Sequence, residues 1–110
     1  MMDWVKLERT EQLEEIMRSS HPIAIFKHST RCHISSMALR NFESNWTVGS
    51  DKCMPYFLDL ITYRDLSNEI SRITGVVHES PQLLLIKNGK VIHSASHHSI
   101  DANEIASKLA

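Results

Sequence analysis

The chain has 110 residues, of which 42% are hydrophobic and 23% charged, and its 12 basic and 13 acidic residues give a formal net charge of −1. This length suits a single domain with one core over residues 1–110, and the balanced charge, without a basic patch, argues against a nucleic-acid partner. No signal peptide is visible, nor any apolar stretch of the ~20 residues that a membrane helix needs, so we expect a cytoplasmic protein without a membrane partner.

The first helix is predicted just after Thr10, whose hydroxyl suits the N-terminal cap of a helix over residues 11–19. Its apolar stripe consists of Leu13, Ile16 and Met17. Residues 23–26 are apolar throughout and are bounded by breakers, as in a strand that is buried on both faces of a parallel sheet. From residue 34 the apolar side chains recur at helical spacing, which predicts a second helix ending near Glu43. The stripe of this helix consists of Ile34, Met37, Ala38 and Phe42.

The second half of the chain continues the alternation of strands and helices. Residues 54–61 regain strand character, and Asp65 suits the cap of a helix that Gly75 would terminate. The buried stripe of that helix is expected to consist of Leu66, Ile70 and Ile73. Residues 83–86 and 91–92 flank an Asn-Gly pair, the strongest short signal of a β-hairpin. A final helix is predicted after Asp101, with Ile105 and Leu109 as its apolar contacts.

Helices and strands therefore alternate until a hairpin and a last helix complete the chain. Such alternation requires parallel neighbouring strands with helices over both faces of the sheet, and the hairpin adds an antiparallel edge. The predicted fold is an α/β sandwich of three layers, with a central mixed sheet of four to five strands.

The chemistry is predicted to lie at Cys32, where the strand over residues 23–26 gives way to the next helix. Free backbone N–H groups in the first turn of a helix favour an anion, and such a position favours the thiolate. Neighbouring basic side chains add to this effect: Lys27, His28, Arg31 and His33. His33 either tunes the thiol or is an ordinary solvated helix residue. Ser35, one helical turn after the cysteine, can hydrogen-bond the thiolate.

The order of elements, with a cysteine at the first central junction of strand and helix, resembles the thioredoxin fold over about Thr10 to Leu109. A second stretch supports the resemblance. The segment Gly75–Lys90 is similar to the thioredoxin-family segment in which a glycine ends a helix and a cis-proline precedes a strand and an Asn-Gly hairpin. The resemblance implies that Pro81 is this cis-proline and that Ser80 and Pro81 position the disulfide substrate in the active-site groove.

One departure from thioredoxins concerns the active-site motif. Thioredoxins have Cys-x-x-Cys, whereas this chain has Cys32-His33-Ile34-Ser35. Cys-x-x-Ser without a resolving cysteine is the monothiol arrangement of many glutaredoxins and of bacilliredoxin-like proteins. The segment Phe26–Ala38 resembles the monothiol bacilliredoxin family of the bacillithiol redox system, with a histidine in place of the family's proline.

That resemblance implies a thiol–disulfide oxidoreductase in which Cys32 is the nucleophile. Its thiolate attacks a mixed disulfide between a client protein and a small thiol, the small thiol moves onto the cysteine, and a second small-thiol molecule releases it. The implied partners are S-thiolated client proteins, and the co-substrate is a low-molecular-weight thiol, bacillithiol or glutathione, with no bound cofactor. Arg31 or Lys27 would bind the carboxylates that such thiols carry.

Two other functions stay open. A thioredoxin-fold module without enzymatic activity would bind partners or sense redox state by becoming S-thiolated, and some monothiol glutaredoxins hold an iron–sulfur cluster between two subunits. Cys53 precedes a strand and is interpreted as a structural or incidental residue and not as a resolving cysteine. The histidines His93, His97 and His98 have no cysteine or carboxylate at ligand spacing, so we expect no metal site.

Overall fold

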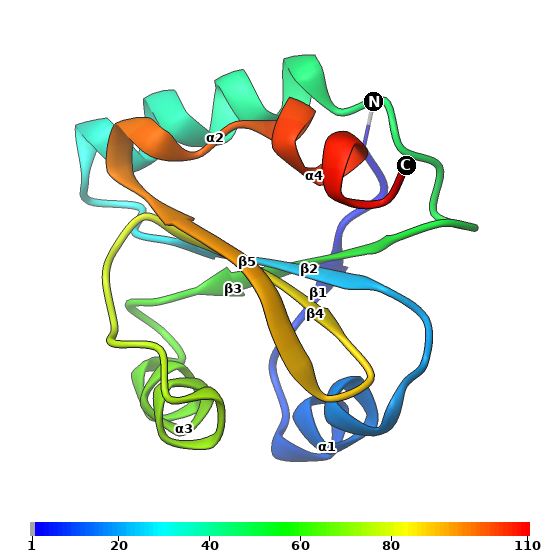
Figure 1. The fold of residues 1–110 in the computed structure, drawn as a ribbon. Helices are drawn as coiled ribbons and strands as arrows, with labels where there is room; N and C mark the ends of the chain where they lie inside the picture. The colour runs from blue at the N-terminus through cyan, green and yellow to red at the C-terminus, as the bar shows by residue number, and fades with distance from the viewer. Residues whose placement is uncertain (1) are drawn as a thin grey trace.

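A five-stranded mixed sheet forms the middle of the molecule in the computed structural model, which describes residues 2–110 (Figure 1). The strands are β1 (Val5–Lys6), β2 (Ile23–His28), β3 (Met54–Asp59), β4 (Gln82–Lys87) and β5 (Lys90–Ser96), in the order β1-β3-β2-β4-β5. β2 runs parallel to β3 and antiparallel to β4, so the sheet changes from parallel to antiparallel at its centre. The prediction of a mixed sheet with a hairpin at its edge is confirmed.

Helices cover both faces of this sheet (Figure 1). α2 (His33–Asn45) and α4 (Ala102–Lys108) lie over one face, and α1 (Thr10–Arg18) and α3 (Arg64–Thr74) lie over the other. A short 3-10 turn, η1 (His97–Ser99), leads from β5 into α4. Within residues 2–110 no helix combines the length and the apolar character that crossing a bilayer requires. The predicted three-layer α/β sandwich is confirmed.

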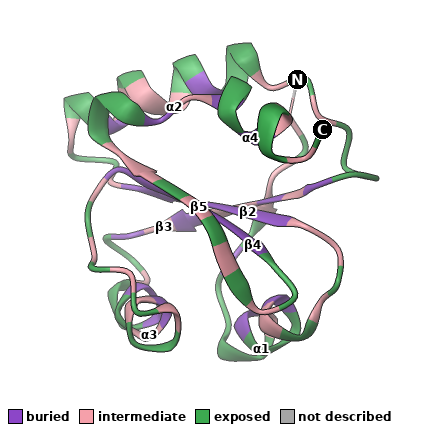
Figure 2. Cartoon of the chain, viewed as in Figure 1, coloured by how far each residue is buried: buried purple, intermediate pink, exposed green. Residues whose placement is uncertain are grey.

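The side chains of β2 alternate between two hydrophobic cores. Ile23 and Ile25 pack in the core beneath α1 and α3, whereas Ala24 and Phe26 pack in the core beneath α2 and α4. All 6 residues of β2 are buried, and Figure 2 shows the buried colour along the centre of the sheet. A strand with helices over both of its faces needs such a continuous apolar run, which is why the sequence predicts it.

Two helices turn a different face to the sheet than their apolar spacing predicts. In α2, Ile34 and Met37 are 41% and 44% exposed, whereas Ser35 and Phe42 are buried. In α3, Ile73 is 39% exposed. The predicted stripes are therefore wrong at these three apolar positions. Ser35 can face inward because its hydroxyl finds hydrogen-bond partners at the end of β2.

The starts of the helices also differ from the prediction. Thr10 is the first residue of α1 and not its cap, because Arg9 occupies the cap position, where its backbone N–H donates to the side chain of Gln12 at 2.9 Å. Asp65 lies inside the first turn of α3, where its charge favours the helix dipole but does not cap the helix. Asp101 does cap α4, as predicted, since its side chain accepts the N–H two residues on at 2.9 Å.

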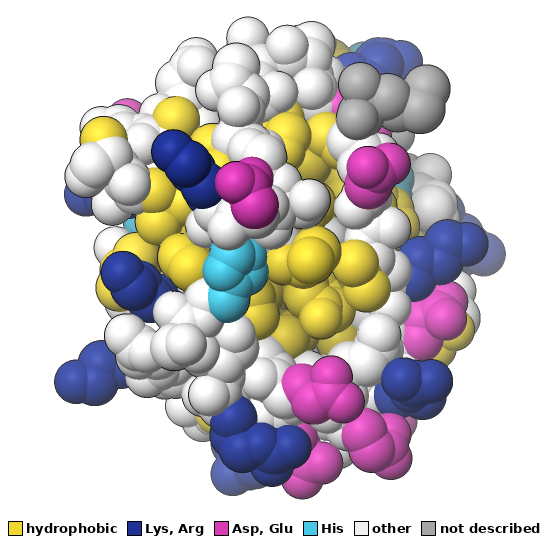
Figure 3. Space-filling view, turned by 90° about the vertical axis from the view of Figure 1, so that its right-hand side faces the viewer, with side chains coloured by type: hydrophobic (Ala, Val, Ile, Leu, Met, Phe, Trp, Pro, Cys, Tyr) yellow, Lys and Arg dark blue, Asp and Glu magenta, His cyan; other side chains and the backbone are white. Residues whose placement is uncertain are grey.

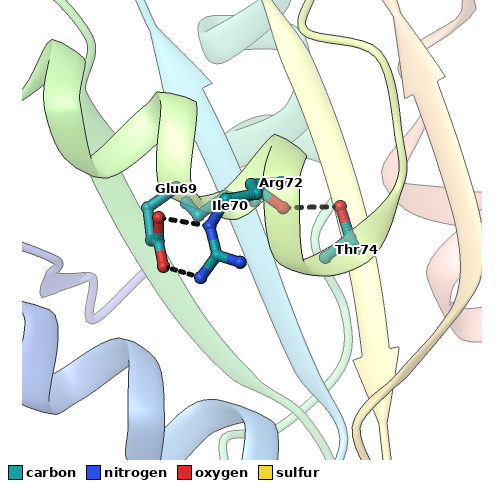
Figure 4. Close-up of polar contacts among 4 residues, drawn as sticks. All are labelled: Glu69, Ile70, Arg72 and Thr74. Atoms are coloured by element: carbon teal, nitrogen blue, oxygen red, sulfur yellow. Dashed lines mark hydrogen bonds and ion pairs between the residues drawn. The ribbon is translucent and has the colours of Figure 1, made fainter.

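Polar side chains close the last turn of α3 (Figure 4). Arg72 Nε donates to Glu69 Oε1 at 2.9 Å, and Thr74 Oγ1 donates to the carbonyl oxygen of Ile70 at 2.7 Å. Gly75 follows with a left-handed φ of 75°, as predicted for a residue just past the end of a helix. The loop that leads from α3 to β4 begins here.

The hairpin between β4 and β5 turns at the predicted Asn-Gly pair. Asn88 and Gly89 have φ values of 54° and 74°, the left-handed conformations that a two-residue hairpin turn requires. A Cβ atom on Gly89 would lie 2.8 Å from the carbonyl oxygen of Met17, so only glycine fits this close approach to α1. The backbone N–H of Asn88 donates to Ser19 at 3.2 Å and fastens the hairpin to the end of the same helix.

Candidate active site

Cys32 lies at the N-terminal cap of α2, directly after the turn that follows β2. Its backbone N–H donates to the carbonyl of Ser29 at 3.2 Å, and its own carbonyl accepts the N–H of Ser36 at 3.1 Å. The thiol is free and half-buried. The structure therefore places this sulfur-bearing residue at the start of a helix that has 13 residues, as the sequence predicts.

The electrostatic setting of this cysteine is that of a helix N-terminus. Within the described helix, the cysteine side chain makes no capping hydrogen bond and the first turn contains no acidic residue. A thiolate would thus be stabilised by the field of the free N–H groups and not by a hydrogen bond already formed. Arg31 and His33 flank the thiol in sequence and are both exposed, so water screens their contribution.

Ser35 is buried and already has hydrogen-bond partners. Its Oγ accepts the backbone N–H of Ser29 at 3.0 Å and shares a hydrogen bond with Nδ1 of His28 at 2.7 Å. A hydroxyl has one hydrogen, so Ser35 gives it either to His28 or to another acceptor such as the Cys32 thiolate. Which of these occurs depends on the ring nitrogen at which His28 holds its proton. In either case this serine ties the start of α2 to the end of β2.

Replacing Ser35 by alanine is expected to lower the free energy of unfolding by about 1–3 kcal/mol, because the substitution leaves buried polar groups of His28 and Ser29 without their partner. Urea unfolding followed by circular dichroism measures the loss. Ser36→Ala, one position further along the same helix, is the matched control and should change stability by less than about 0.5 kcal/mol. Similar small losses for both variants would show that the Ser35 hydroxyl contributes nothing.

His28 is the site residue whose environment the sequence predicts least well. It is 6% exposed and lies against the rings of Phe26 and Phe57 in the core beneath α2. Burial lowers its pKa, while the negative charges of Asp59 and Glu43 act in the opposite direction. At neutral pH the imidazole is therefore uncharged, and His28 acts as a hydrogen-bond partner of Ser35 where the sequence indicates a cation.

Lys27 points to the opposite face of the sheet. Its side chain is 0% exposed, and its Nζ lies 3.4 Å from the carbonyl oxygen of Ser67 and 3.5 Å from Nδ1 of His78. Burial lowers the pKa of this amine from 10.5 to about 8. The alternation of side chains along β2 explains the placement, since Lys27 follows Ile25 on the α1 and α3 side. The structure thus groups Lys27 with α3 and its following loop, not with the thiol.

Lys27 should make the free energy of unfolding depend on pH between about 8 and 10.5, the pKa values of the folded and the ordinary amine. In this window the unfolded chain holds the proton more tightly, so the stability of the fold rises with pH. Lys27→Met should therefore be more stable than the wild type below pH 8, and the difference should shrink by about 2 kcal/mol, after allowance for solvent screening, as the pH rises to 10.5. Urea unfolding of both proteins at several pH values measures this difference. A difference that stays constant with pH would contradict the burial of a titrating amine.

The residues expected to line the substrate groove lie at the same edge of the sheet as the thiol. Lys27, near the end of β2, pairs with Gln82 at the start of β4, so the residues after β2 and before β4 are neighbours. The Ser80–Pro81 peptide bond is cis, as the resemblance implies. The carbonyl oxygen of Pro81 accepts the N–H of His97 at 3.1 Å, which joins η1 to the same edge.

Cys53 lies in a different environment from Cys32. It is fully buried in the core beneath α2, and burial raises the pKa of its thiol to about 12, with a smaller opposing contribution from a backbone hydrogen bond of Ala24. Its thiolate population at neutral pH is negligible. Of the two cysteines, Cys32 is therefore the accessible one.

Two hollows of the surface lie away from the thiol. One of about 480 Å³ is lined by polar residues around the start of α3, including Glu8 and Asp65. Another, of about 200 Å³, lies at the beginnings of β2 and β3, where its lining includes His21, Ile23 and Met54. Figure 3 shows the right-hand side of the view in Figure 1, where hydrophobic side chains gather around a histidine. Because β2 starts at Ile23 and Cys32 follows its other end, this second hollow does not belong to the candidate site.

Comparison with known proteins assigns both a family and a fold. A family model described as monothiol bacilliredoxin BrxC matches residues 5–105. A solved thioredoxin-fold structure, of a protein proposed to be an oxidoreductase, has a TM-score of 0.80 at 30% identity and covers 94% of this chain and 90% of its own. Thioredoxin from Malassezia sympodialis has a TM-score of 0.75 at 18% identity over 97% and 88% of the two chains. For thioredoxin from Trypanosoma brucei brucei the TM-score is 0.70 at 14% identity over 97% and 87%. The fold is thus the thioredoxin fold that the sequence predicts.

Proposed function

The chain belongs to the monothiol bacilliredoxin family, and from this membership we propose that it is a cytoplasmic thiol–disulfide oxidoreductase that removes small thiols from S-thiolated client proteins. The small thiol we propose is bacillithiol, and glutathione is the alternative. The observation that supports the proposal most strongly is the contrast between the two thiols. Cys32 is half-buried at a helix start, at the same end of the sheet as the cis Ser80–Pro81 bond, whereas Cys53 is sealed in the core.

The proposed reaction consists of two thiol–disulfide exchanges. The Cys32 thiolate attacks the small-thiol sulfur of the client's mixed disulfide, a new sulfur–sulfur bond forms, and the client cysteine leaves as a thiolate that takes a proton from water. The thiolate of a second small-thiol molecule then attacks the sulfur of that small thiol on Cys32. Cys32 leaves as a thiolate, and the two small thiols depart as their symmetric disulfide. Overall, one free small-thiol molecule is consumed for each client: the client cysteine becomes a free thiol, and the consumed small thiol leaves in a symmetric disulfide with the small thiol that the client carried.

Each site residue has a distinct part in this proposal. The free N–H groups of α2 stabilise the leaving and attacking thiolate of Cys32, and exposed Arg31 and His33 attract the carboxylates of the small thiol. Ser80 and Pro81 position the extended disulfide at the start of β4. Because the fourth residue of the motif is a serine, no second cysteine competes with the small thiol for the intermediate.

A turnover assay on a model protein with a single S-thiolated cysteine tests this function. The client is prepared in two forms, one with bacillithiol and one with glutathione, and is incubated with the matching free thiol and catalytic amounts of the protein. We expect loss of the adduct mass at least about tenfold faster than with the free thiol alone, and fastest in the bacillithiol pair. Adduct formation on Cys32 without turnover would favour a redox-sensing module, and visible absorption of the purified protein would favour a cluster carrier. No acceleration with either client would contradict the proposed activity.

A further inference from the structure

The buried ammonium group of Lys27 has no acidic partner among residues 2–110. The ion pairs of this part of the chain are Glu69–Arg72 and Glu79–His97. Burying a charge without a counter-charge destabilises a fold, and hydrophobic replacements of buried ions are often neutral or stabilising. A lysine within β2, a strand that is otherwise mostly apolar, therefore calls for a reason other than stability.

The backbone carbonyl of Ser67 in α3 and the ring of His78 in the loop after α3 lie next to this ammonium group. Nδ1 of His78 lies 3.5 Å from Nζ of Lys27 and 3.2 Å from Oγ of the buried Ser67. A nitrogen that faces two donors acts as the acceptor, so His78 holds its proton on Nε2 and is neutral. Burial lowers the pKa of His78, the positive charges of Lys27 and Arg64 lower it further, and Glu79 opposes them. The imidazole is thus fixed as an uncharged acceptor.

The same loop has a second link to the sheet. Gln82 pairs with Lys27 across β2 and β4, and its Nε2 donates to the carbonyl oxygen of Val77 at 3.0 Å. The paired residues Gln82 and Lys27 therefore contact two consecutive residues of the loop. Gln82 binds the backbone of Val77, and Lys27 contacts the ring of His78. Val76 packs against the core beneath α1 and α3, whereas the side chain of Val77 is 79% exposed, so apolar packing fixes the start of this segment and contributes little beyond it. After Val76 the position of the segment depends on polar contacts such as these, and it ends at Ser80 and Pro81.

We propose that Lys27 is a positioning residue: through the ring of His78, its buried ammonium group fixes the segment 76–80 and thereby the Ser80–Pro81 edge against which the disulfide substrate binds. This inference rests on the proposed function, which assigns Ser80 and Pro81 to the substrate groove. Lys27 faces α3, and Cys32 begins α2 on the other side of the sheet. We therefore expect Lys27 to affect the binding of the substrate and not the reactivity of the Cys32 thiol.

Three variants separate this role from a purely structural one. Lys27→Met removes the charge and keeps the length of the side chain, His78→Leu removes the acceptor, and His78→Asn supplies an amide oxygen near the position of Nδ1. Lys87→Met is the matched control, since Lys87 is an exposed residue of β4. Lys27→Met also avoids a failure to fold, because it removes an unpaired charge from the interior.

Steady-state kinetics on an S-thiolated client should show a KM raised about 5- to 10-fold in Lys27→Met and in His78→Leu, with kcat and the alkylation rate of Cys32 within about twofold of the wild type. His78→Asn and Lys87→Met should keep the wild-type KM. A folded Lys27→Met protein with unchanged KM, or one whose Cys32 alkylation slows in step with turnover, would overturn the proposal.

Amide hydrogen exchange tests the same role without any activity. Residues 76–80 should exchange about fivefold faster or more in Lys27→Met than in the wild type or in Lys87→Met, while β2 and α3 exchange as before. If the wild type shows no turnover but this segment loses protection, the proposed function fails and the positioning role stands. Unchanged exchange over residues 76–80 would overturn the positioning role whatever the activity.

Discussion

Cys32→Ser is expected to abolish the release of small thiols from client proteins, with turnover reduced at least about a thousandfold. A serine hydroxyl cannot form the mixed disulfide, and Cys53 cannot replace the lost thiol because it is buried and its pKa is raised to about 12. The exchange of one atom at a half-buried cap position should leave the fold intact. Loss of the adduct mass from a model client, followed over time by mass spectrometry, measures the effect.

Cys53→Ala is the control for this experiment. It removes the other cysteine from the chain, and we expect turnover within about twofold of the wild type as long as the core tolerates the smaller side chain. Circular dichroism of both variants establishes that they are folded before rates are compared. Substantial activity in Cys32→Ser together with loss of activity in Cys53→Ala would show that the nucleophile is Cys53 and contradict the assignment to Cys32.

Of the substitutions considered, Phe42→Ala should destabilise the fold most and lower the free energy of unfolding by about 3–5 kcal/mol. Phe42 is 1% exposed and fixes α2 to the sheet. Its ring lies 5.5 Å from that of Phe26, 5.9 Å from that of Trp4 and 5.4 Å from that of Trp46. Removing it opens a cavity beneath the helix that presents the thiol, in a domain whose total stability is expected to be about 5–15 kcal/mol.

Urea unfolding of the purified variant measures this loss, and Met37→Ala on the same helix is its matched control. Met37 is 44% exposed, so its truncation should change stability by less than about 0.5 kcal/mol. A loss of similar size in the two variants would mean that α2 does not pack against the sheet through the face that the structure shows.

Regular patterns made most of the fold predictable. The unbroken apolar run over residues 23–26 predicts a central strand, and the Asn-Gly pair predicts the hairpin, because each has few alternative conformations. Gly75 and Asp101 are similarly specific at helix ends. The position of Cys32 at a helix start followed from the same boundary between strand and helix.

The sequence did not predict how the buried polar side chains are arranged. Apolar spacing places Ile34 and Met37 in the core, but the hydrogen bonds available to Ser35 rotate α2 so that a serine faces inward. Lys27 and His28 appear in the sequence as two cations beside the thiol. Strand alternation sends them to opposite faces of the sheet, where burial lowers both pKa values and gives each a different partner. Such contacts between distant segments have no local signal in the chain.

Mass spectrometry of the wild-type protein after separate incubation with oxidised bacillithiol and oxidised glutathione tests the central assignment most directly. Trypsin separates the two cysteines, because Arg31 precedes one and Lys52 the other, and the resulting peptides span residues 32–40 and 53–64. We predict a small-thiol adduct on the peptide 32–40 alone, which disappears when the reduced thiol is added. No adduct with either disulfide, or an adduct on the peptide 53–64, would contradict the assignment of the chemistry to Cys32.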